Sequence, residues 1–209
     1  MGTRNMTVVI ANDEIKVAQY CQWDGYPSGQ GSTVHSFIKE YLNGDEAEVK
    51  RKAYKELITA LGSIGEEQRM AEWVKAGAKE EDRFVSSEIA AVFKKNNPHL
   101  SRDTGALILK MIADGLTDVE ADPGFLADGL MCEWAYVLDM DNNNLEVYSG
   151  FDEEERPGRF AHMKLEGNKY WPVSLLHTYS FDDLPNLHDF CEELEQLNRE
   201  KHGYDEEEE

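Results

Sequence analysis

Two strand patterns open the chain and set the first constraint on its fold. Residues 7–11 and 15–20 are rich in apolar and β-branched side chains, and Asn12-Asp13-Glu14 between them has a turn composition. An isolated two-stranded hairpin is only marginally stable in water. The hairpin therefore needs additional strands from elsewhere in the chain.

Strand patterns return only after residue 129. Residues 131–138 and 145–151 flank a polar loop, and residues 160–165 and 170–181 indicate a second pair. Between the two strand regions, about residues 32–115, apolar side chains recur at helical spacing, and a last helix is expected over 187–199. The expected N-caps in the middle are Ser32, Asp45, either Ser86 or Ser87, and Ser101. One expected buried stripe is Val49, Ala53, Leu57 and Leu61.

This order of patterns predicts an α+β fold. The N-terminal hairpin and the C-terminal strands form one antiparallel sheet, and the central helical segment packs on one face of it. A chain of 209 residues fits one domain, expected over 1–204, followed by an acidic tail over 205–209.

Charge and composition exclude several classes of function. Forty-two acidic residues face twenty-one basic ones, for a net charge of −21, so direct nucleic-acid binding is not expected. The chain has no long apolar run and no apolar leader, which predicts no membrane partner and a cytoplasmic location, the host cytoplasm for a viral protein. The three cysteines lack metal-ligand spacing, so neither a metal nor another cofactor is expected.

The segment from Gln22 to Gly31 is the strongest candidate for a binding site. It places Trp, Asp, Tyr, Pro and three glycines directly before a predicted helix. Glycines let backbone amides approach a ligand, the helix start favours an anion, and the aromatic rings offer stacking surfaces. Residues on the neighbouring strands and at a later helix start complete the predicted set: Arg4, Tyr20, Gln22, Trp23, Asp24, Gly25, Tyr26, Gly29, Gly31 and Arg102.

The alternative interpretation of this segment is a structural corner. In that case Trp23 and Tyr26 fill the core, Asp24 caps the turn and Arg4 pairs with Asp24. The segment matches neither a Walker loop nor a GxGxxG loop, and the chain contains no HExxH or GxSxG motif. Thr3 as an N-terminal nucleophile would require a cut beyond Met1. No catalytic residue is therefore assigned, and whether the protein is an enzyme stays open.

The same residues carry a resemblance. The opening Met1–Asn5, the strand 17–20 and the segment 22–31 resemble an uncharacterised family of bacterial, phage and fungal hypothetical proteins. Members open with MGTR and carry a Q-W/F-D-G-Y-P-x-G-x-G segment. The match covers about the first forty residues, with weaker likeness at 101–105 and 133–137. This resemblance implies no activity, and Cys21 replaces a glycine typical of the family.

Two functions from different classes follow. In the first, the glycine and aromatic segment recognises a small polar ligand, for example a nucleotide-like one. In the second, the acidic chain is an interaction or inhibitor protein, of the phage counter-defence or nucleic-acid mimic type, that binds a basic partner.

Overall fold

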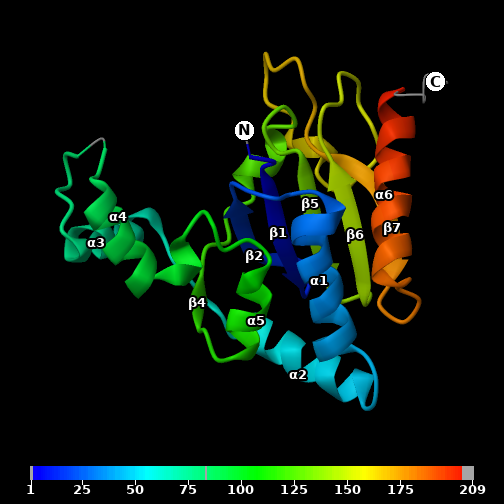
Figure 1. The fold of residues 1–209 in the computed structure, drawn as a ribbon, viewed down its shortest axis with the longest axis horizontal. Helices are drawn as coiled ribbons and strands as arrows, with labels where there is room; N and C mark the ends of the chain where they lie inside the picture. The colour runs from blue at the N-terminus through cyan, green and yellow to red at the C-terminus, as the bar shows by residue number, and fades with distance from the viewer. Residues whose placement is uncertain (1, 83, 204–209) are drawn as a thin grey trace.

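The computed structural model describes residues 2–82 and 84–203, which form a five-stranded sheet with helices around it (Figure 1). The strands of this sheet are β1 (Asn5–Ala11), β2 (Glu14–Cys21), β5 (Trp134–Asp139), β6 (Asn144–Ser149) and β7 (Ser174–Ser180). The α-helices are α1 (Ser32–Phe37), α2 (Ala47–Thr59), α3 (Glu66–Ala76), α4 (Ser87–Asn96), α5 (Leu107–Ala113) and α6 (Leu187–His202). Two short strands, β3 (Gly62–Ser63) and β4 (Asp118–Val119), pair separately, and helical turns cover Pro27–Gly31, Ile38–Leu42, Pro98–Leu100, Gly124–Ala127 and Ala161–Met163.

The sheet joins the N-terminal hairpin to the C-terminal strands in the order β2-β1-β5-β6-β7, which confirms the α+β prediction. One pairing differs from the expected antiparallel sheet: β1 and β5 are parallel, with Asn5 opposite Trp134. The reason lies in the order of the strands. β2 is the preceding strand of this sheet, and β5 runs antiparallel to it. β5 lies beside β1, however, and β1 is itself antiparallel to β2, so β1 and β5 run in the same direction.

Helices cover one face of the sheet. Val9, Tyr136 and Leu138 point into a core that α1, α2, α5 and α6 complete, with Val34, Ile58, Ile108 and Phe190 among their buried residues. The intervening strand positions face the other side, because successive side chains in a strand alternate. There Met6, Val8, Ile10, Ala135 and Val137 pack against Leu126, Phe160 and Val173. Leu126 lies in the helical turn Gly124–Ala127, and the other two lie outside helices and strands.

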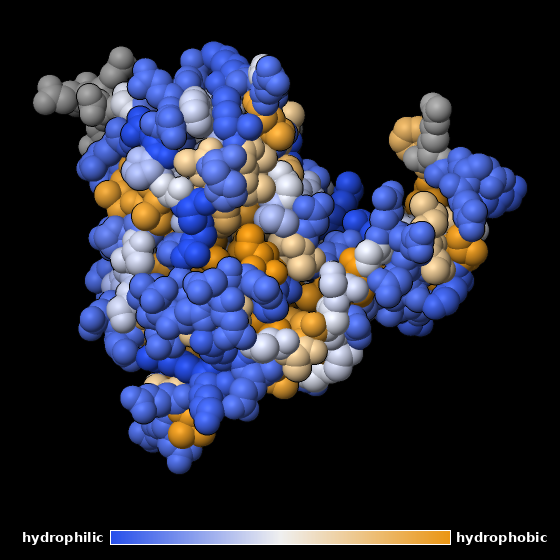
Figure 2. All heavy atoms as spheres, turned by 180° about the vertical axis from the view of Figure 1, so that it is seen from behind, coloured by the Kyte–Doolittle hydropathy of each residue, from blue (hydrophilic) through white to orange (hydrophobic). Residues whose placement is uncertain are grey.

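Helices α3 and α4, called the arm below, extend away from the sheet (Figure 1). The prediction that the whole helical middle packs on the sheet is therefore wrong for this part. No side chain of α3 is buried, and the arm is held mainly by its own contacts, with the Trp73 and Phe93 rings parallel at 3.7 Å. In the space-filling view the arm stands apart from the body, with hydrophilic surface around a few apolar residues (Figure 2).

The buried face of α2 also differs from the predicted stripe. Arg51, Tyr54 and Ile58 are buried, whereas Val49 and Leu57 are 64% and 44% exposed. Arg51 points inward because its guanidinium has partners there: Leu42 O at 3.0 Å, Asn43 Oδ1 at 2.5 Å and Asp182 Oδ1 at 2.6 Å. A paired charge can be buried, and a pattern that counts only apolar residues does not detect it.

Several local predictions have clear outcomes. The Ser86 cap is confirmed, since its Oγ accepts the Ile89 N–H at 3.3 Å. The other three caps are wrong: α1 continues directly from the 27–31 turn, α2 begins after Glu46 without a side-chain cap, and α5 begins only at Leu107. Residues 160–165 contain a helical turn instead of a strand, and β7 pairs with β6.

The last helix is confirmed and extends to His202, while the predicted acidic tail at 205–209 lies outside the described residues. None of the described helices is long and apolar enough to cross a membrane.

Candidate functional site

The segment from Gln22 to Gly31, called the glycine loop below, closes on itself through its backbone. The N–H groups of Gly29 and Gly31 donate to the Tyr26 carbonyl at 2.9 and 3.3 Å, and Gln30 N–H donates to Asp24 O at 2.7 Å. Gly25 N–H donates to the Thr3 carbonyl at 2.9 Å. The amides of Gly25, Gly29, Gln30 and Gly31 are therefore occupied within the protein and are not free to hold an anion.

Two glycines of the loop are required by packing. A Cβ on Gly29 would lie 2.1 Å from the Asp24 carbonyl oxygen, and one on Gly31 would lie 2.8 Å from the Tyr136 hydroxyl. That buried hydroxyl donates to Gly25 O at 2.9 Å, which ties the loop to β5. The backbone of the loop therefore has a structural role.

The two aromatic side chains of the loop remain accessible. Trp23 is 44% exposed and Tyr26 is 41% exposed, so neither fills the core. Trp23 Nε1 donates to Asp103 Oδ1 at 3.1 Å, and its ring lies against Gly2, where a Cβ would come within 2.2 Å of the ring. Trp23 thus connects the N-terminal segment to the turn before α5.

The predicted charged residues do not meet at one point. Among the described residues, no hydrogen bond or ion pair joins the side chains of Arg4, Asp24 and Arg102. Arg4 instead donates from Nη1 to Met131 Sδ at 2.7 Å and from Nη2 to Glu133 Oε1 at 3.5 Å. Arg102 contributes its carbonyl, which accepts the Gln22 N–H at 2.8 Å. Of the predicted set, only Tyr20 and Arg4 line the two cavities described next, one residue in each.

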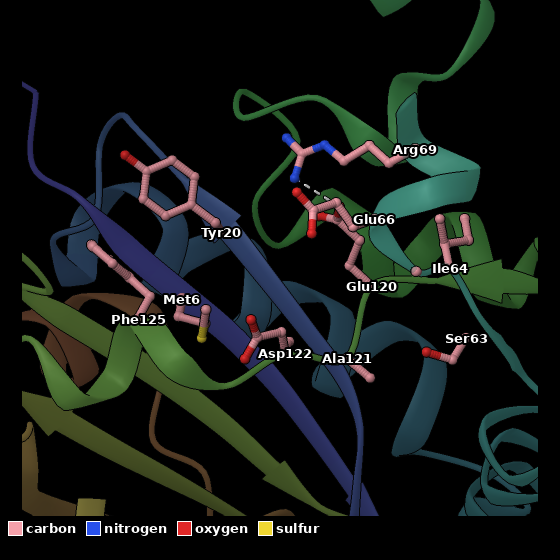
Figure 3. Close-up of a pocket in the computed structure, with 12 residues that line it drawn as sticks. Met6, Tyr20, Ser63, Ile64, Glu66, Arg69, Glu120, Ala121, Asp122 and Phe125 are labelled. Carbon is pink, nitrogen blue, oxygen red and sulfur yellow. Dashed lines mark hydrogen bonds and ion pairs between the residues drawn. The ribbon is translucent and has the colours of Figure 1, made fainter. Parts of the chain in front are cut away.

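The first, the Tyr20 cavity, is an open hollow of about 660 Å³ along the outer edge of β2 (Figure 3). β2 is an edge strand of the main sheet, and the hollow lies where the β3–β4 pair and the start of α3 approach it. Its lining consists of Met6, Ala18, Tyr20, Ser63, Ile64, Gly65, Glu66, Arg69, Glu120, Ala121, Asp122 and Phe125.

One wall of the Tyr20 cavity is aromatic. The Tyr20 and Phe125 rings meet edge to face, with centroids 4.9 Å apart. The Tyr20 hydroxyl donates to Gln22 Oε1 at 2.7 Å. Burial raises the pKa of Tyr20 above its ordinary value, against the opposing effect of Arg4 and Arg102, so the hydroxyl stays protonated. The glycine loop thus orients this wall through Gln22.

The opposite wall is charged. Glu66 and Arg69 come from α3, and Glu120 and Asp122 follow β4 (Figure 3). Arg69 Nη1 pairs with Glu120 Oε1 at 2.9 Å, while Asp122 Oδ1 accepts the Gly124 N–H at 2.8 Å. The lining therefore holds three carboxylates and one guanidinium, and the excess negative charge favours a cationic group in the cavity.

The second, the Arg4 cavity, has a volume of about 290 Å³ and lies beside the N-terminal segment. Arg4 and Glu133 supply its charged groups. Leu130, Met131 and Phe151 supply apolar surface, with exposed fractions of 40%, 38% and 41%. Gly2 and Thr3 complete the lining.

Most residues of both cavities were not identified from the sequence. Tyr20 and Arg4 were predicted, but Glu66, Arg69, Glu120 and Phe125 come from segments that carry no motif. These residues share only a charge or an aromatic ring close to the end of a predicted helix or strand. Many surface residues have the same property, so it does not identify a binding site. The sheet edge, not local sequence, brings them together.

The described residues include no group of three or more His, Cys, Asp or Glu side chains arranged to hold a metal ion. No family model, curated protein or solved structure matches this chain.

Proposed function

We propose that this protein binds a small polar ligand in the Tyr20 cavity, and that the ligand combines a positive charge with a flat or apolar part. The observation that carries the proposal is the pairing of walls: Tyr20 and Phe125 on one side, and Glu66, Glu120 and Asp122 on the other. Concave sites that join apolar surface to a few convergent polar groups are typical of ligand pockets.

Size supports a small ligand. A volume of about 660 Å³ lies within the usual range for small-molecule sites, roughly 300–1,000 Å³. The cavity is open, so a ligand enters without unfolding any element. The edge of β2 and the Phe125 ring form its more rigid side, because both belong to or contact the buried sheet.

Charge selects among polar ligands. A phosphate group would meet three carboxylates and a single, already paired guanidinium, so it would be repelled. A protonated amine or a nucleoside fits this lining better than a nucleotide does. The aromatic wall would contact the flat part of the ligand while the carboxylates accept hydrogen bonds from its donors.

The proposal can be tested by thermal unfolding of the full chain with matched ligand pairs. Tyramine is compared with 4-hydroxyphenylacetate, and adenosine with adenosine monophosphate. A ligand present at one hundred times its dissociation constant adds about 2.7 kcal/mol to stability. For a chain of this size this corresponds to a melting-temperature increase of roughly 5–10 °C. We expect it for the cationic or neutral member of each pair only.

A matched variant locates the binding. Glu66→Gln combined with Asp122→Asn should weaken binding of the responsive ligand roughly threefold to tenfold. The effect is modest because both removed charges are exposed to solvent. Glu67→Gln removes a carboxylate from the same turn of α3 outside the cavity and should leave affinity unchanged. Equal responses to both members of each pair, or equal effects of the two variants, would contradict the proposal.

A second candidate function is binding of a basic protein partner by the acidic surface of α6 and of the segment just before it. Asp182, Asp183, Asp189, Glu192 and Glu193 are exposed there, and Arg199 is the only Arg or Lys over residues 182–200. Such a surface favours a basic protein partner, with binding that weakens as salt screens the attraction. Pull-down with this chain at 50 and 500 mM salt tests it, since retention of a partner at both concentrations would contradict an electrostatic interface.

A further inference from the structure

Arg4 is a charged side chain of the second cavity whose donors are poorly matched by their partners. Its Nη1 donates to a thioether sulfur, Met131 Sδ, at 2.7 Å, and thioethers are weak acceptors. Its Nε is buried and has no hydrogen-bond partner within residues 2–82 and 84–203. Its contact with Glu133 Oε1, at 3.5 Å, is at the limit of a hydrogen bond.

A guanidinium normally directs its parallel N–H groups at a carboxylate or a phosphate. Glu133 does not fill this role, because its Oε1 also accepts the backbone N–H of Arg4, at 3.2 Å. That backbone bond would hold Glu133 in place if the guanidinium turned to another acceptor. Arg4 therefore retains donors for a ligand oxygen.

Leu130, Met131 and Phe151 form an apolar side of the Arg4 cavity, and Phe151 is held in position. Phe151 has a φ of 65°, a conformation that non-glycine residues rarely adopt. Its N–H donates to Gly129 O at 2.7 Å, and its ring contacts the Tyr170 and His202 rings edge to face. Strained backbone that its surroundings hold in place is common at binding sites. Here it presents the ring beside Leu130 and Met131.

We infer that the Arg4 cavity binds the carboxylate of a small monoacid that carries a short apolar chain. The carboxylate accepts from the Arg4 guanidinium in place of the Met131 sulfur, and the chain lies on Leu130, Met131 and Phe151. A volume of about 290 Å³ is at the lower end for ligand sites and limits the acid to a small one. A single negative charge suits the site better than a phosphate dianion, because Glu133 lies in the same wall. This site is separate from the Tyr20 cavity and does not depend on the function proposed for it.

The test is calorimetric titration of the full chain with acetate, butyrate and hexanoate, with hexylamine and inorganic phosphate for comparison. Each buried methylene should tighten binding of the acid about threefold to fourfold. A short peptide ending in leucine distinguishes a peptide C-terminus from a free acid as the source of the carboxylate. Either source supports the site, whereas hexylamine or phosphate binding as tightly as hexanoate would overturn it.

Variants assign the binding to Arg4. Arg4→Gln should weaken hexanoate binding more than tenfold, while Arg199→Gln, which removes an exposed guanidinium on α6, should leave it unchanged. Met131→Leu keeps the apolar wall, removes the competing sulfur and should bind hexanoate at least as tightly as the unaltered chain. Thermal unfolding of each variant confirms that it folds. Hexanoate binding that survives Arg4→Gln, or is lost in Met131→Leu, would refute the inference.

Discussion

Single residues connect parts of this molecule that are far apart in the chain. Asp141, in the loop between β5 and β6, accepts the backbone N–H groups of Asn12 and Asp13 at 2.9 and 2.8 Å, and pairs with Lys55 at 2.6 Å. It thus holds the first hairpin turn, the second hairpin loop and α2 together. Burial opposes ionisation of Asp141, but the bonds from Asp13, Lys55 and Asn12 outweigh it and lower the pKa to about 2.

This lowered pKa predicts a stability difference that depends on pH. The folded value of about 2 lies below the ordinary 3.8, so the ionised carboxylate stabilises the fold above pH 4. That contribution decreases as the pH falls from about 4 toward 2. Asp141→Asn should reduce the free energy of unfolding by about 1–2 kcal/mol at pH 7 and by much less at pH 2.5. Urea unfolding of the unaltered chain and the variant at both pH values measures the difference.

Asp183→Asn is the matched control for this prediction, since it removes an exposed carboxylate before α6. A difference between Asp141→Asn and the unaltered chain that does not change with pH would contradict the assigned role.

The glycine loop gives a second prediction for a single residue. Gly29→Ala places a Cβ 2.1 Å from a backbone carbonyl, which cannot rotate away. We expect a loss of about 2–3 kcal/mol in the free energy of unfolding, as is typical of overpacking. Gly65→Ala is the comparison, because its nearest neighbour would be a flexible side-chain atom at 3.8 Å, and it should change stability by less than about 0.5 kcal/mol. Equal losses would show that the close approach is not what requires glycine.

Among the elements, the arm depends least on the rest of the molecule. Its two helices share the stacked Trp73 and Phe93 rings, and no residue of α3 is buried. Elements with few buried contacts open without global unfolding. Trp73→Ala should therefore increase amide hydrogen exchange throughout α3 and α4, while protection in α5 and β5 stays unchanged. The half-exposed Met70 offers a control, since Met70→Ala removes an apolar side chain outside the stack.

Mass spectrometry of exchanged peptides measures this effect. If α5 and β5 lost protection together with the arm, the arm would be part of the cooperative core instead of a separate unit.

Elements with a regular apolar period were predictable, and elements defined by distant partners were not. The first hairpin, the 131–151 strand pair, α3 and α6 each carry a clear local pattern. The inward Arg51 depends on Asp182, which is 131 residues away. The parallel pairing of β1 with β5 depends on which strands become neighbours, and no local pattern carries that information. Both cavities are likewise lined by segments that are distant in the sequence. Among their main residues, only Tyr20 and Arg4 were therefore predicted.

The whole molecule carries a net charge of −21, and this charge opposes its compact state. Added salt screens repulsion between exposed charges, with a Debye length that falls from about 30 Å at 0.01 M to about 10 Å at 0.1 M. The melting temperature should therefore rise by a few degrees between 10 and 150 mM sodium chloride. Potassium chloride at equal ionic strength should give the same rise. A fall in melting temperature would show that attractive ion pairs outweigh the net repulsion.

The position of β1 in the sheet also affects how the chain folds during its synthesis. β1 is fully buried between β2 and β5, and Asn5 pairs with Trp134. During translation at about 5–20 residues per second, the ribosome takes on the order of ten seconds to complete β5 after β1 has emerged. Throughout that interval one hydrogen-bonding side of an apolar strand is open to other nascent chains. The hairpin is therefore most prone to pair with other chains before β5 has been synthesised.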